Sequence, residues 1–236
     1  MSITAGYLMK AMLLAAGRGE RLRPLTDHTP KPLIEVGGRT LIEWQIARLY
    51  RAGVREFVIN LAHLGAQIEA KLGDGRRYGA RFQYSVEPDG ALEAGGGIRH
   101  ALPLLGASPF IVANADVWIE FDYARVPALN GDLGHVVLVP NPTHNSRGDL
   151  ALEGDRVRND GDLRLTFAGV AVYSPAMFEH LPEGRFPLAP LLREAAARGL
   201  LGGQLQAGNW IDVGTPERLA ETRLRVASLT GDALLI

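Results

Sequence analysis

The residues best suited to chemistry gather in one short segment near the N-terminus, residues 14–32, with the sequence LAAGRGERLRPLTDHTPKP. Gly17 and Gly19 let the backbone turn tightly and bring its N–H groups close to an anion without interference from a Cβ atom. Arg21 and Lys31 add positive side chains, and two further arginines lie nearby. A loop with this many hydrogen-bond donors at the end of a buried strand predicts the binding of a polyphosphate.

Two common phosphate-binding motifs do not fit this loop. The dinucleotide fingerprint needs a third glycine at position 22, where the chain has Leu22, and this disfavours an NAD-binding oxidoreductase. The P-loop motif needs glycine at 22 followed by lysine, and the residues are Leu22 and Arg23. The simplest alternative is a glycine-rich turn with solvated arginines. The nearby Pro24 and the pair at 31–32 make that the weaker interpretation.

Two carboxylates lie far from this loop in the sequence. Asp116 follows the apolar run 109–114, and Asp212 precedes a strand-to-helix turn at 214–216. A carboxylate at the carboxyl end of a strand in an open α/β sheet faces the crevice where ligands bind. Two carboxylates together with phosphate oxygens suit Mg²⁺. Taken singly, Asp116 could be a turn residue and Asp212 a helix cap, but beside a cationic loop the pair predicts a metal site.

No pair of residues predicts a covalent mechanism. The chain has no cysteine, which excludes thiol catalysis and cysteine-ligated metals, and its six histidines are scattered without metal-ligand spacing. This absence is compatible with direct attack of one phosphate on another, because the attacking oxygen is already anionic and nothing must be deprotonated.

The composition is that of a globular enzyme. Of 236 residues, 47% are apolar, and 25 basic and 26 acidic side chains give a net charge of −1, so no excess positive charge exists for a polyanion. No apolar run approaches the ~20 residues needed to cross a bilayer, and residues 1–8 lack the basic start of a targeting signal. We therefore expect a cytoplasmic monomer or small homo-oligomer without nucleic-acid or membrane partners.

The elements that must position these residues alternate in the first half of the chain. Short apolar runs predict strands at 11–15, 56–60 and 109–114, and alternation of polar and apolar residues predicts one at 81–85. Helical spacing of apolar residues predicts helices at 41–52, 64–72 and 97–105. This repetition predicts parallel βαβ crossovers, and hence a doubly wound, mostly parallel α/β sheet.

The pattern changes after Asp116. Strand-like segments lie at 135–140, 150–153, 165–173 and 200–206, and helices are expected at 188–198 and 216–229. No linker divides the chain, so we expect a single domain over 1–236, with a nucleotide-binding half at about 10–116 and a mixed sheet extension at about 117–236. No hexapeptide repeat follows the last helix, and no C-terminal β-helix is expected.

Three separated motifs resemble those of one enzyme family. Residues 14–32 match the pattern G-x-G-[STE]-R-[LM]-x-P-L-T…K-P, residues 114–116 (NAD) resemble a metal-binding step, and residues 210–215 resemble W-x-D-x-G-T. The combination is similar to that of the sugar-1-phosphate nucleotidyltransferases. The resemblance implies a Rossmann-like nucleotide-diphospho-sugar transferase fold. It also implies Mg²⁺-dependent transfer of a nucleotidyl group from a nucleoside triphosphate to a sugar 1-phosphate, with release of pyrophosphate.

The resemblance also implies roles for individual residues. Arg21 and Lys31 would be catalytic, and Asp116 and Asp212 would hold Mg²⁺. The residues implied to bind the nucleotide are Leu14, Ala16, Gly17, Gly19, Glu20, Arg21, Asn60, Glu87, Glu93 and Gly95. Those implied to bind the sugar, in part from the second half of the chain, are Asn114, Gly148, Ala168 and Gly169.

In this interpretation, Arg21 neutralises the departing pyrophosphate, and Lys31 reaches both the α-phosphate and the attacking sugar phosphate. The chain departs from the hexose-specific members at 159–162, where NDGD replaces an E-K-P motif whose lysine contacts the sugar phosphate. Lys31 or an arginine such as Arg147 must therefore supply that charge.

Within the family, the likeness is greatest to short uridylyltransferases that act on N-acetylmuramate 1-phosphate in peptidoglycan recycling. It rests on residues 59–60 (IN), 63–65 (HLG), 92–98 (LEAGGGI), 116–118 (DVW) and 141–149. UTP and N-acetylmuramic acid 1-phosphate are thus the expected substrates. The alternatives are a glucose-1-phosphate thymidylyltransferase, a mannose-1-phosphate guanylyltransferase and, from another class, a non-catalytic regulatory paralogue that binds nucleotide sugars.

Overall fold

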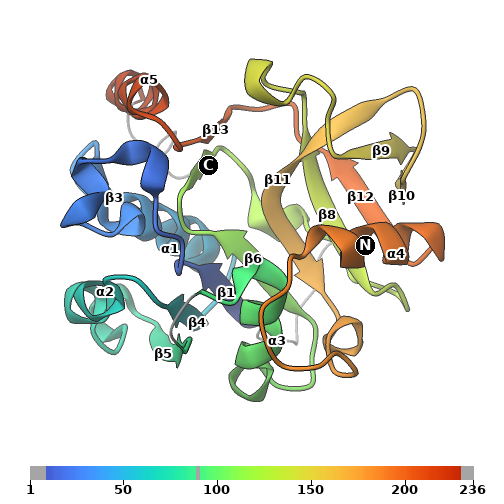
Figure 1. Ribbon diagram of the computed structural model, residues 1–236, viewed down its shortest axis with the longest axis horizontal. Coiled ribbons are helices and arrows are strands. Elements are labelled where there is room, and N and C mark those ends of the chain that lie inside the picture. Colours follow the sequence, from blue (N-terminus) through green and yellow to red (C-terminus); the bar gives the residue numbers. More distant parts are fainter. Residues whose placement is uncertain (1–8, 89–90, 230–236) are drawn as a thin grey trace.

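The computed structural model describes residues 9–88 and 91–229. Its centre is one nine-stranded sheet with helices on both faces (Figure 1). In spatial order the strands are β5 (Arg81–Val86), β4 (Glu56–Leu61), β1 (Ala11–Leu14), β6 (Phe110–Asn114), β11 (Arg164–Tyr173), β8 (Gly134–Val139), β12 (Leu201–Leu205), β10 (Arg156–Arg158) and β9 (Leu150–Glu153). β10 and β11 run against the other strands, so the sheet is mixed, as the sequence predicts. No helix among the described residues is long and apolar enough to span a bilayer.

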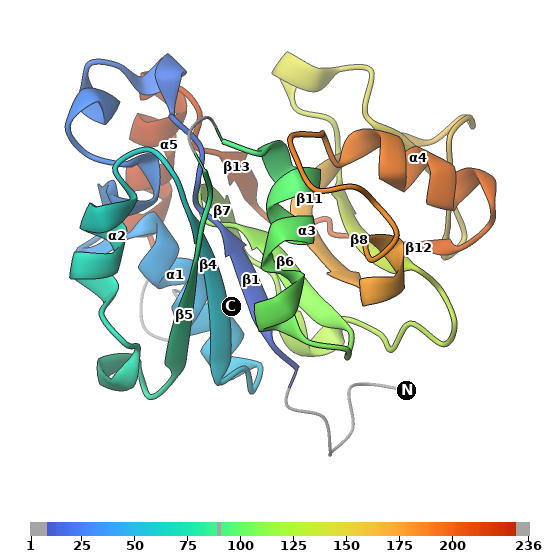
Figure 2. The same cartoon turned by 60° about the horizontal axis from the view of Figure 1, so that its bottom comes forward.

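The first four strands in this order are parallel and are connected by helices. α1 (Leu41–Arg51) and α2 (Gly65–Leu72) pack on one face, and α3 (Glu93–Leu105) packs on the other (Figure 2). Neighbouring residues of one strand enter different cores, since Leu13 packs with the first pair of helices and Met12 with α3. Burial on both faces explains why these strands are continuous apolar runs in the sequence.

Capping residues explain where two of the helices begin. The Thr40 hydroxyl accepts a hydrogen bond from the Glu43 N–H at 3.4 Å, and the Glu43 carboxylate accepts one from the Thr40 N–H at 2.9 Å, which starts α1 with a capping box. α5 (Pro216–Ala227) follows Thr215, whose hydroxyl accepts from the Arg218 N–H at 3.4 Å. Both starts agree with the sequence prediction.

The start of α3 does not agree with the prediction of a helix over 97–105. The helix begins at Glu93 and contains Gly95, Gly96 and Gly97, a run of glycines that would by itself be typical of a flexible helix entry. A Cβ atom on Gly96 would overlap the carbonyl oxygen of Gly184, and one on Gly97 would lie 2.5 Å from Glu87 Oε1. Close packing around the first turns of α3, rather than a flexible entry, requires glycine there.

The second half of the sheet continues the same layers. β8 and β12 are parallel neighbours, and α4 (Ala189–Ala197) packs into the same core as α3. β11 joins the two halves because it pairs with β6 on one side and with β8 on the other. Its register with β8 shifts between Phe167 and Ala171, and Gly169 within this irregularity lies against the end of β6.

A separate two-stranded sheet brings the late part of the chain back to the end of β6. β7 (Val117–Ile119) pairs antiparallel with β13 (Trp210–Asp212), and Asp212 lies opposite Val117. α5 follows β13 and contacts β2 (Glu35–Val36), which forms a hairpin with β3 (Arg39–Thr40). The sequence analysis did not predict the pairing of β7 with β13, and this pairing sets the geometry of the site.

Candidate active site

The glycine-rich loop leaves the carboxyl end of β1 and leads into a single 3-10 turn at Glu20–Leu22. Gly19 has φ 65°, and a Cβ atom there would lie 2.9 Å from Thr26 Cγ2, so this position requires glycine. The Thr26 hydroxyl donates to the Gly19 carbonyl at 2.8 Å and fixes the turn. A Cβ atom on Gly17 would meet no atom within 4 Å. The exposed side of the loop is therefore open for a ligand.

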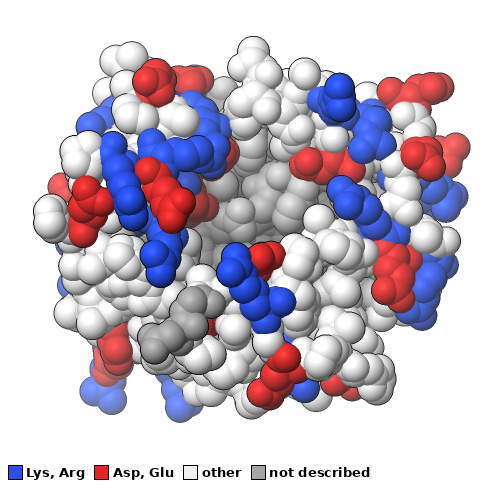
Figure 3. Space-filling view, viewed as in Figure 1, with Lys and Arg blue, Asp and Glu red and all other residues white. Residues whose placement is uncertain are grey.

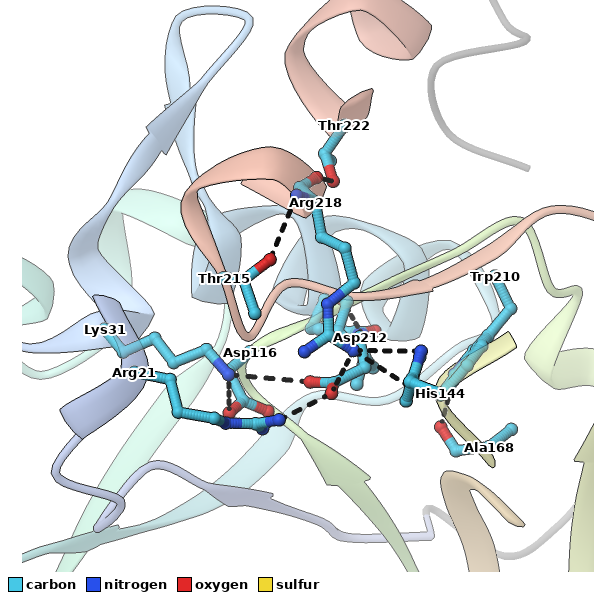
Figure 4. A network of polar contacts seen from close by, with 12 residues as sticks. Arg21, Lys31, Asp116, His144, Ala168, Trp210, Asp212, Thr215, Arg218 and Thr222 are labelled. Carbon is cyan, nitrogen blue, oxygen red and sulfur yellow. Dashed lines mark hydrogen bonds and ion pairs between the residues drawn. The ribbon is translucent and has the colours of Figure 1, made fainter. Parts of the chain in front are cut away.

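Lys31 lies in the 3-10 turn Lys31–Leu33 and is buried, although it carries a charge. Its ammonium donates to Asp116 Oδ2 at 2.6 Å and lies 3.6 Å from Asp212 Oδ1 (Figure 4). Contacts with two carboxylates hold the lysine ammonium in a fixed position. The structure thus brings the predicted catalytic lysine and both predicted metal ligands to one point.

The pairing of β7 with β13 is what places the two carboxylates together. Asp116 precedes β7 directly, and Asp212 is the last residue of β13, opposite Val117. Both side chains are partly exposed, Asp116 by 30% and Asp212 by 22%. Their oxygens are therefore accessible to a ligand while they remain in contact with Lys31.

Glu120 fastens this small sheet to α5. Its carboxylate accepts hydrogen bonds from Arg225 Nε and Nη2 at 2.9 and 3.0 Å, and from Asn209 Nδ2 at 2.8 Å. Partial burial raises the pKa of Glu120, but these hydrogen bonds lower it by more, so the pKa lies below its usual value of 4.5. The ionised carboxylate links β7, which follows Asp116, with β13, which ends at Asp212, and with α5, which follows β13.

Two arginines complete the charged cluster. Arg21 Nη2 lies 3.5 Å from Asp212 Oδ2, and Arg218 Nη1 lies 3.0 Å from the same oxygen. The Arg21 side chain is 64% exposed, whereas that of Arg218 is 14% exposed. Sequence reasoning missed Arg218, because an arginine in the first turn of an amphipathic helix ordinarily predicts a solvated residue.

The two aspartates suit a divalent cation that keeps several water ligands, rather than one enclosed entirely by protein ligands. Their carboxylates converge on one ammonium, so both can approach a single small ion. Within the part of the chain that the structure describes, no group of three or more His, Cys, Asp or Glu side chains is placed to hold a metal. Mg²⁺ commonly binds to one or two carboxylates and takes its other ligands from water and substrate phosphates. Asp116 and Asp212 match that pattern.

A first cavity opens beside the glycine loop, between the ends of β4 and β5. It is lined by Ala16, Arg18, Ala62, His63, Glu87, Pro88 and Ala91. Behind it, Asn60 Oδ1 accepts from the Ala15 N–H at 2.7 Å, and Asn60 Nδ2 donates to Glu87 Oε1 at 2.6 Å. The second Glu87 oxygen accepts from the Leu92 N–H at 2.7 Å. Asn60 and Glu87 thus tie the start of the glycine loop to the segment before α3, as expected for a nucleotide pocket.

Two further predicted nucleotide residues, Glu93 and Gly95, belong to the first turn of α3. Glu93 forms an ion pair with Arg185 at 2.9 Å and lines a second cavity. A Cβ atom on Gly95 would lie 2.7 Å from the ring of Phe186, so packing against that ring accounts for this glycine. The described residues that line the first cavity include neither Glu93 nor Gly95. Glu20 lies beside Arg21 at a further pocket, next to Lys31 and Asp116.

The second cavity has a volume of about 420 Å³ and lies between α3, β6, β11 and α4. Its lining includes Leu14, Glu93, Asn114 and Gly169, all predicted for the site, together with Asp149, Phe167, Leu188 and Arg193, which were not. Gly169 has φ 75°, and a Cβ atom there would lie 2.5 Å from Asn114 Nδ2. This close approach shapes the floor of the cavity and explains the glycine.

Two predicted sugar residues lie in the wall behind this cavity. The Gly148 carbonyl accepts from Arg164 Nη2 at 3.4 Å, and Gly148 directly precedes the lining residue Asp149. The Ala168 carbonyl accepts from the Trp210 indole N–H at 2.9 Å (Figure 4). Trp210 therefore connects β13, which carries Asp212, to the strand that lines the cavity.

Figure 3 shows this face of the molecule hollowed at its centre, with positive and negative side chains interspersed along the rim of the hollow. The glycine loop, a charged cluster of one lysine and two aspartates, and cavities on both sides of that cluster lie together on a doubly wound sheet, at the edge where such sheets bind ligands. The chain belongs to the nucleotidyl transferase family, whose family model matches residues 10–148.

Individual relatives are similar over nearly the whole chain. An N-acetylmuramate alpha-1-phosphate uridylyltransferase of Neisseria meningitidis is 49% identical over 224 residues, which cover 91% of this chain and 97% of the relative. An enzyme of the same name from Caulobacter vibrioides is 37% identical over 233 residues, covering 92% and 96%. A crystal structure from Bacillus anthracis, ascribed to a glucose-1-phosphate thymidylyltransferase, superposes with a TM-score of 0.83 at 21% identity, covering 96% and 98%. That structure confirms the predicted fold.

Proposed function

We propose that this protein transfers the uridylyl group of UTP to N-acetylmuramic acid 1-phosphate, giving the UDP-sugar and pyrophosphate, as a cytoplasmic step of peptidoglycan recycling. The reaction class is supported by the close approach of Lys31, Asp116 and Asp212 between the glycine loop and the second cavity. We call this second cavity the sugar-side cavity, because we propose that it receives the sugar. The choice of substrates is supported by the names of the two relatives at 49% and 37% identity. We further propose that the protein acts as a monomer or small homo-oligomer and has no nucleic-acid or membrane partner.

The chemistry needs orientation and charge neutralisation rather than a base. A bond forms between an oxygen of the sugar phosphate and the α-phosphorus, while the bond from the α-phosphorus to the bridging oxygen breaks and pyrophosphate leaves with that electron pair. The attacking oxygen is already anionic, so no side chain has to remove a proton. Holding the two phosphates in line is the main contribution of such a site.

Individual residues supply the charges in this proposal. The loop 16–21 wraps the triphosphate with its backbone N–H groups, and Arg21 meets the leaving pyrophosphate, because its side chain is exposed beside the glycines of that loop. Lys31 is buried and fixed, which suits a point charge shared between the α-phosphate and the acceptor phosphate. Asp116 and Asp212 would hold Mg²⁺, which when bound polarises the phosphate oxygens and offsets their charge.

The test is a substrate panel read by pyrophosphate release. UTP, dTTP, GTP and ATP are each combined with N-acetylmuramic acid 1-phosphate, glucose 1-phosphate and mannose 1-phosphate, with Mg²⁺ or with EDTA. We expect the highest kcat/KM for UTP with N-acetylmuramic acid 1-phosphate, and loss of turnover in EDTA. A preference for dTTP with glucose 1-phosphate, or for GTP with mannose 1-phosphate, would overturn the substrate assignment. Absence of turnover with every pair would favour a regulatory paralogue.

Two separate lysine variants test the role assigned to Lys31. Lys31→Ala removes the charge between the two aspartates and is expected to lower kcat on the order of 10²–10³-fold, as for other fixed electrostatic donors. Lys71→Ala, on the exposed side of α2, is the matched control and should retain wild-type turnover. Near-wild-type kcat for Lys31→Ala would show that this lysine does not serve the chemical step.

A further inference from the structure

We propose that Arg218 binds the phosphate of the acceptor sugar phosphate, an inference that rests on the proposed function. Arg218 stands in the first turn of α5, and its side chain reaches down to the cluster of Lys31, Asp116 and Asp212 (Figure 4). The sequence by itself predicts no role for this residue. It did establish that residues 159–162 offer no lysine for the sugar phosphate.

Hydrogen bonds fix the Arg218 backbone, and its side chain is held by Asp212 Oδ2 at 3.0 Å. The Thr215 hydroxyl accepts from the Arg218 N–H at 3.4 Å, and the Thr222 hydroxyl donates to the Arg218 carbonyl at 2.6 Å. A Cβ atom on Gly214 would lie 2.7 Å from Nη2 of both Arg218 and Arg21, so the missing side chain leaves room for two guanidinium groups. Arg218 is thus a built part of the site and not a solvated surface residue.

The charges of the cluster leave one cation in excess. Arg21, Lys31 and Arg218 all lie within 3.6 Å of a carboxylate oxygen of Asp116 or Asp212, three positive groups against two negative ones. The side chain of Arg218 is only 14% exposed, so its field is screened less by water than that of Arg21. A partly buried excess of positive charge favours an additional anion.

Contacts with the second half of the chain indicate which phosphate Arg218 receives. Arg218 Nη1 lies 2.9 Å from Nε2 of His144, which belongs to the 3-10 turn Thr143–Asn145. The His144 ring stacks on Trp210 with 6.5 Å between centroids, and Trp210 donates to the carbonyl of Ala168, the neighbour of Gly169 in the second cavity. Arg218 therefore lies on the sugar side of the two aspartates, while Arg21 lies on the side of the glycine loop.

Arginine is well suited to this position. Its planar guanidinium can donate two parallel hydrogen bonds to a phosphate, and its charge persists at any working pH. Hydrogen bonds to charged groups contribute about 1.5–3 kcal/mol each, which corresponds to roughly 10–100-fold in affinity. Loss of Arg218 should therefore weaken binding of the sugar phosphate by at least that factor and leave binding of UTP nearly unaffected.

The test compares three variants of α5. Arg218→Gln removes the charge, Arg218→Lys keeps it without the planar fork, and Arg223→Gln is the matched control on the exposed side of the same helix. We measure KM for each substrate and, by calorimetry without nucleotide, the Kd of the sugar phosphate. Arg218→Gln should raise KM and Kd for the sugar phosphate at least tenfold and change KM for UTP less than about twofold. Arg218→Lys should be intermediate, and Arg223→Gln should match the wild type.

Other patterns would overturn the proposal. If Arg218→Gln raises KM equally for UTP and for the sugar phosphate, and also raises the Mg²⁺ concentration needed for activity, then Arg218 only positions Asp212. If Arg193→Gln lowers the affinity for the sugar phosphate tenfold and Arg218→Gln does not, the acceptor phosphate is bound by Arg193, which lines the second cavity. If Arg218→Gln fails to fold, the lysine variant decides. If the wild type prefers another sugar phosphate, the substrate assignment fails, but the same comparison with that sugar phosphate still tests Arg218.

Discussion

A single methyl group at Gly169 should separate sugar binding from nucleotide binding. In Gly169→Ala, the new Cβ atom would lie 2.5 Å from Asn114 Nδ2 and 2.7 Å from Asn114 Cγ. Since non-bonded atoms prefer separations of about 3.5 Å, Asn114 must move by about 1 Å. Gly169 also has φ 75°, a conformation that costs an L-residue about 1–2 kcal/mol.

The size of the effect follows from these two contributions. Overpacking of this kind costs about 1–3 kcal/mol in addition to the backbone cost, so the free energy of unfolding should fall by about 2–5 kcal/mol. Asn114 lines the sugar-side cavity, and a displacement of about 1 Å at a reacting site can lower activity by about 10²-fold. We therefore expect kcat/KM for the sugar phosphate to fall by that order, with KM for UTP almost unchanged.

The assay is urea denaturation together with steady-state kinetics in each substrate. Gly199→Ala is the matched control, because Gly199 has φ 69° and an added Cβ atom there would meet nothing within 4 Å. In Gly199→Ala the free energy of unfolding should fall only by the backbone contribution, and the kinetics should remain those of the wild type. If Gly169→Ala behaves like Gly199→Ala in both measurements, the contact with Asn114 does not shape the site and the reasoning fails.

Two further predictions concern the supports of the site. Asn60→Leu should leave the Ala15 N–H and Glu87 Oε1 without the hydrogen bonds that Asn60 makes to them and lower the free energy of unfolding by about 2–6 kcal/mol, with a raised KM for UTP; a stable variant with unchanged KM would contradict this. Because the pKa of Glu120 is lowered in the fold, its ionised form stabilises the protein above the usual value of 4.5, and this stabilisation is lost as the pH falls through the lowered pKa. Glu120→Gln should therefore flatten the fall of Tm on acidification, and an unaltered pH dependence would speak against the link to Arg225.

The sequence predicts the elements well where local patterns reflect burial. The strands β1, β4 and β6 are buried on both faces, so each forms a continuous apolar run that is visible without the structure. The glycine loop is also visible, because a tight turn beside an anion requires residues without a side chain. Lys31, Asp116 and Asp212 could be proposed because their residue types and order resemble one family.

Other features depend on contacts that no local pattern contains. β7 and β13 are three residues each, too short for a periodic signal, and their pairing involves segments far apart in the chain. The sequence does not reveal why three glycines stand at the start of α3, whereas their neighbours Phe186, Gly184 and Glu87 show that they serve close packing. Arg218 could not be recognised because its side-chain partners, Asp212 and His144, belong to two segments that only the fold brings together.

By itself, then, the sequence determined the layered α/β architecture and the kinds of charged residue available for phosphate chemistry. Only the tertiary structure decided that Lys31 lies 2.6 Å from Asp116 and 3.6 Å from Asp212, and that Arg218 joins them from the sugar side. The physical reason is that backbone preferences and burial patterns act over neighbouring residues. The distance between two charges is instead set by the packing of every element between them.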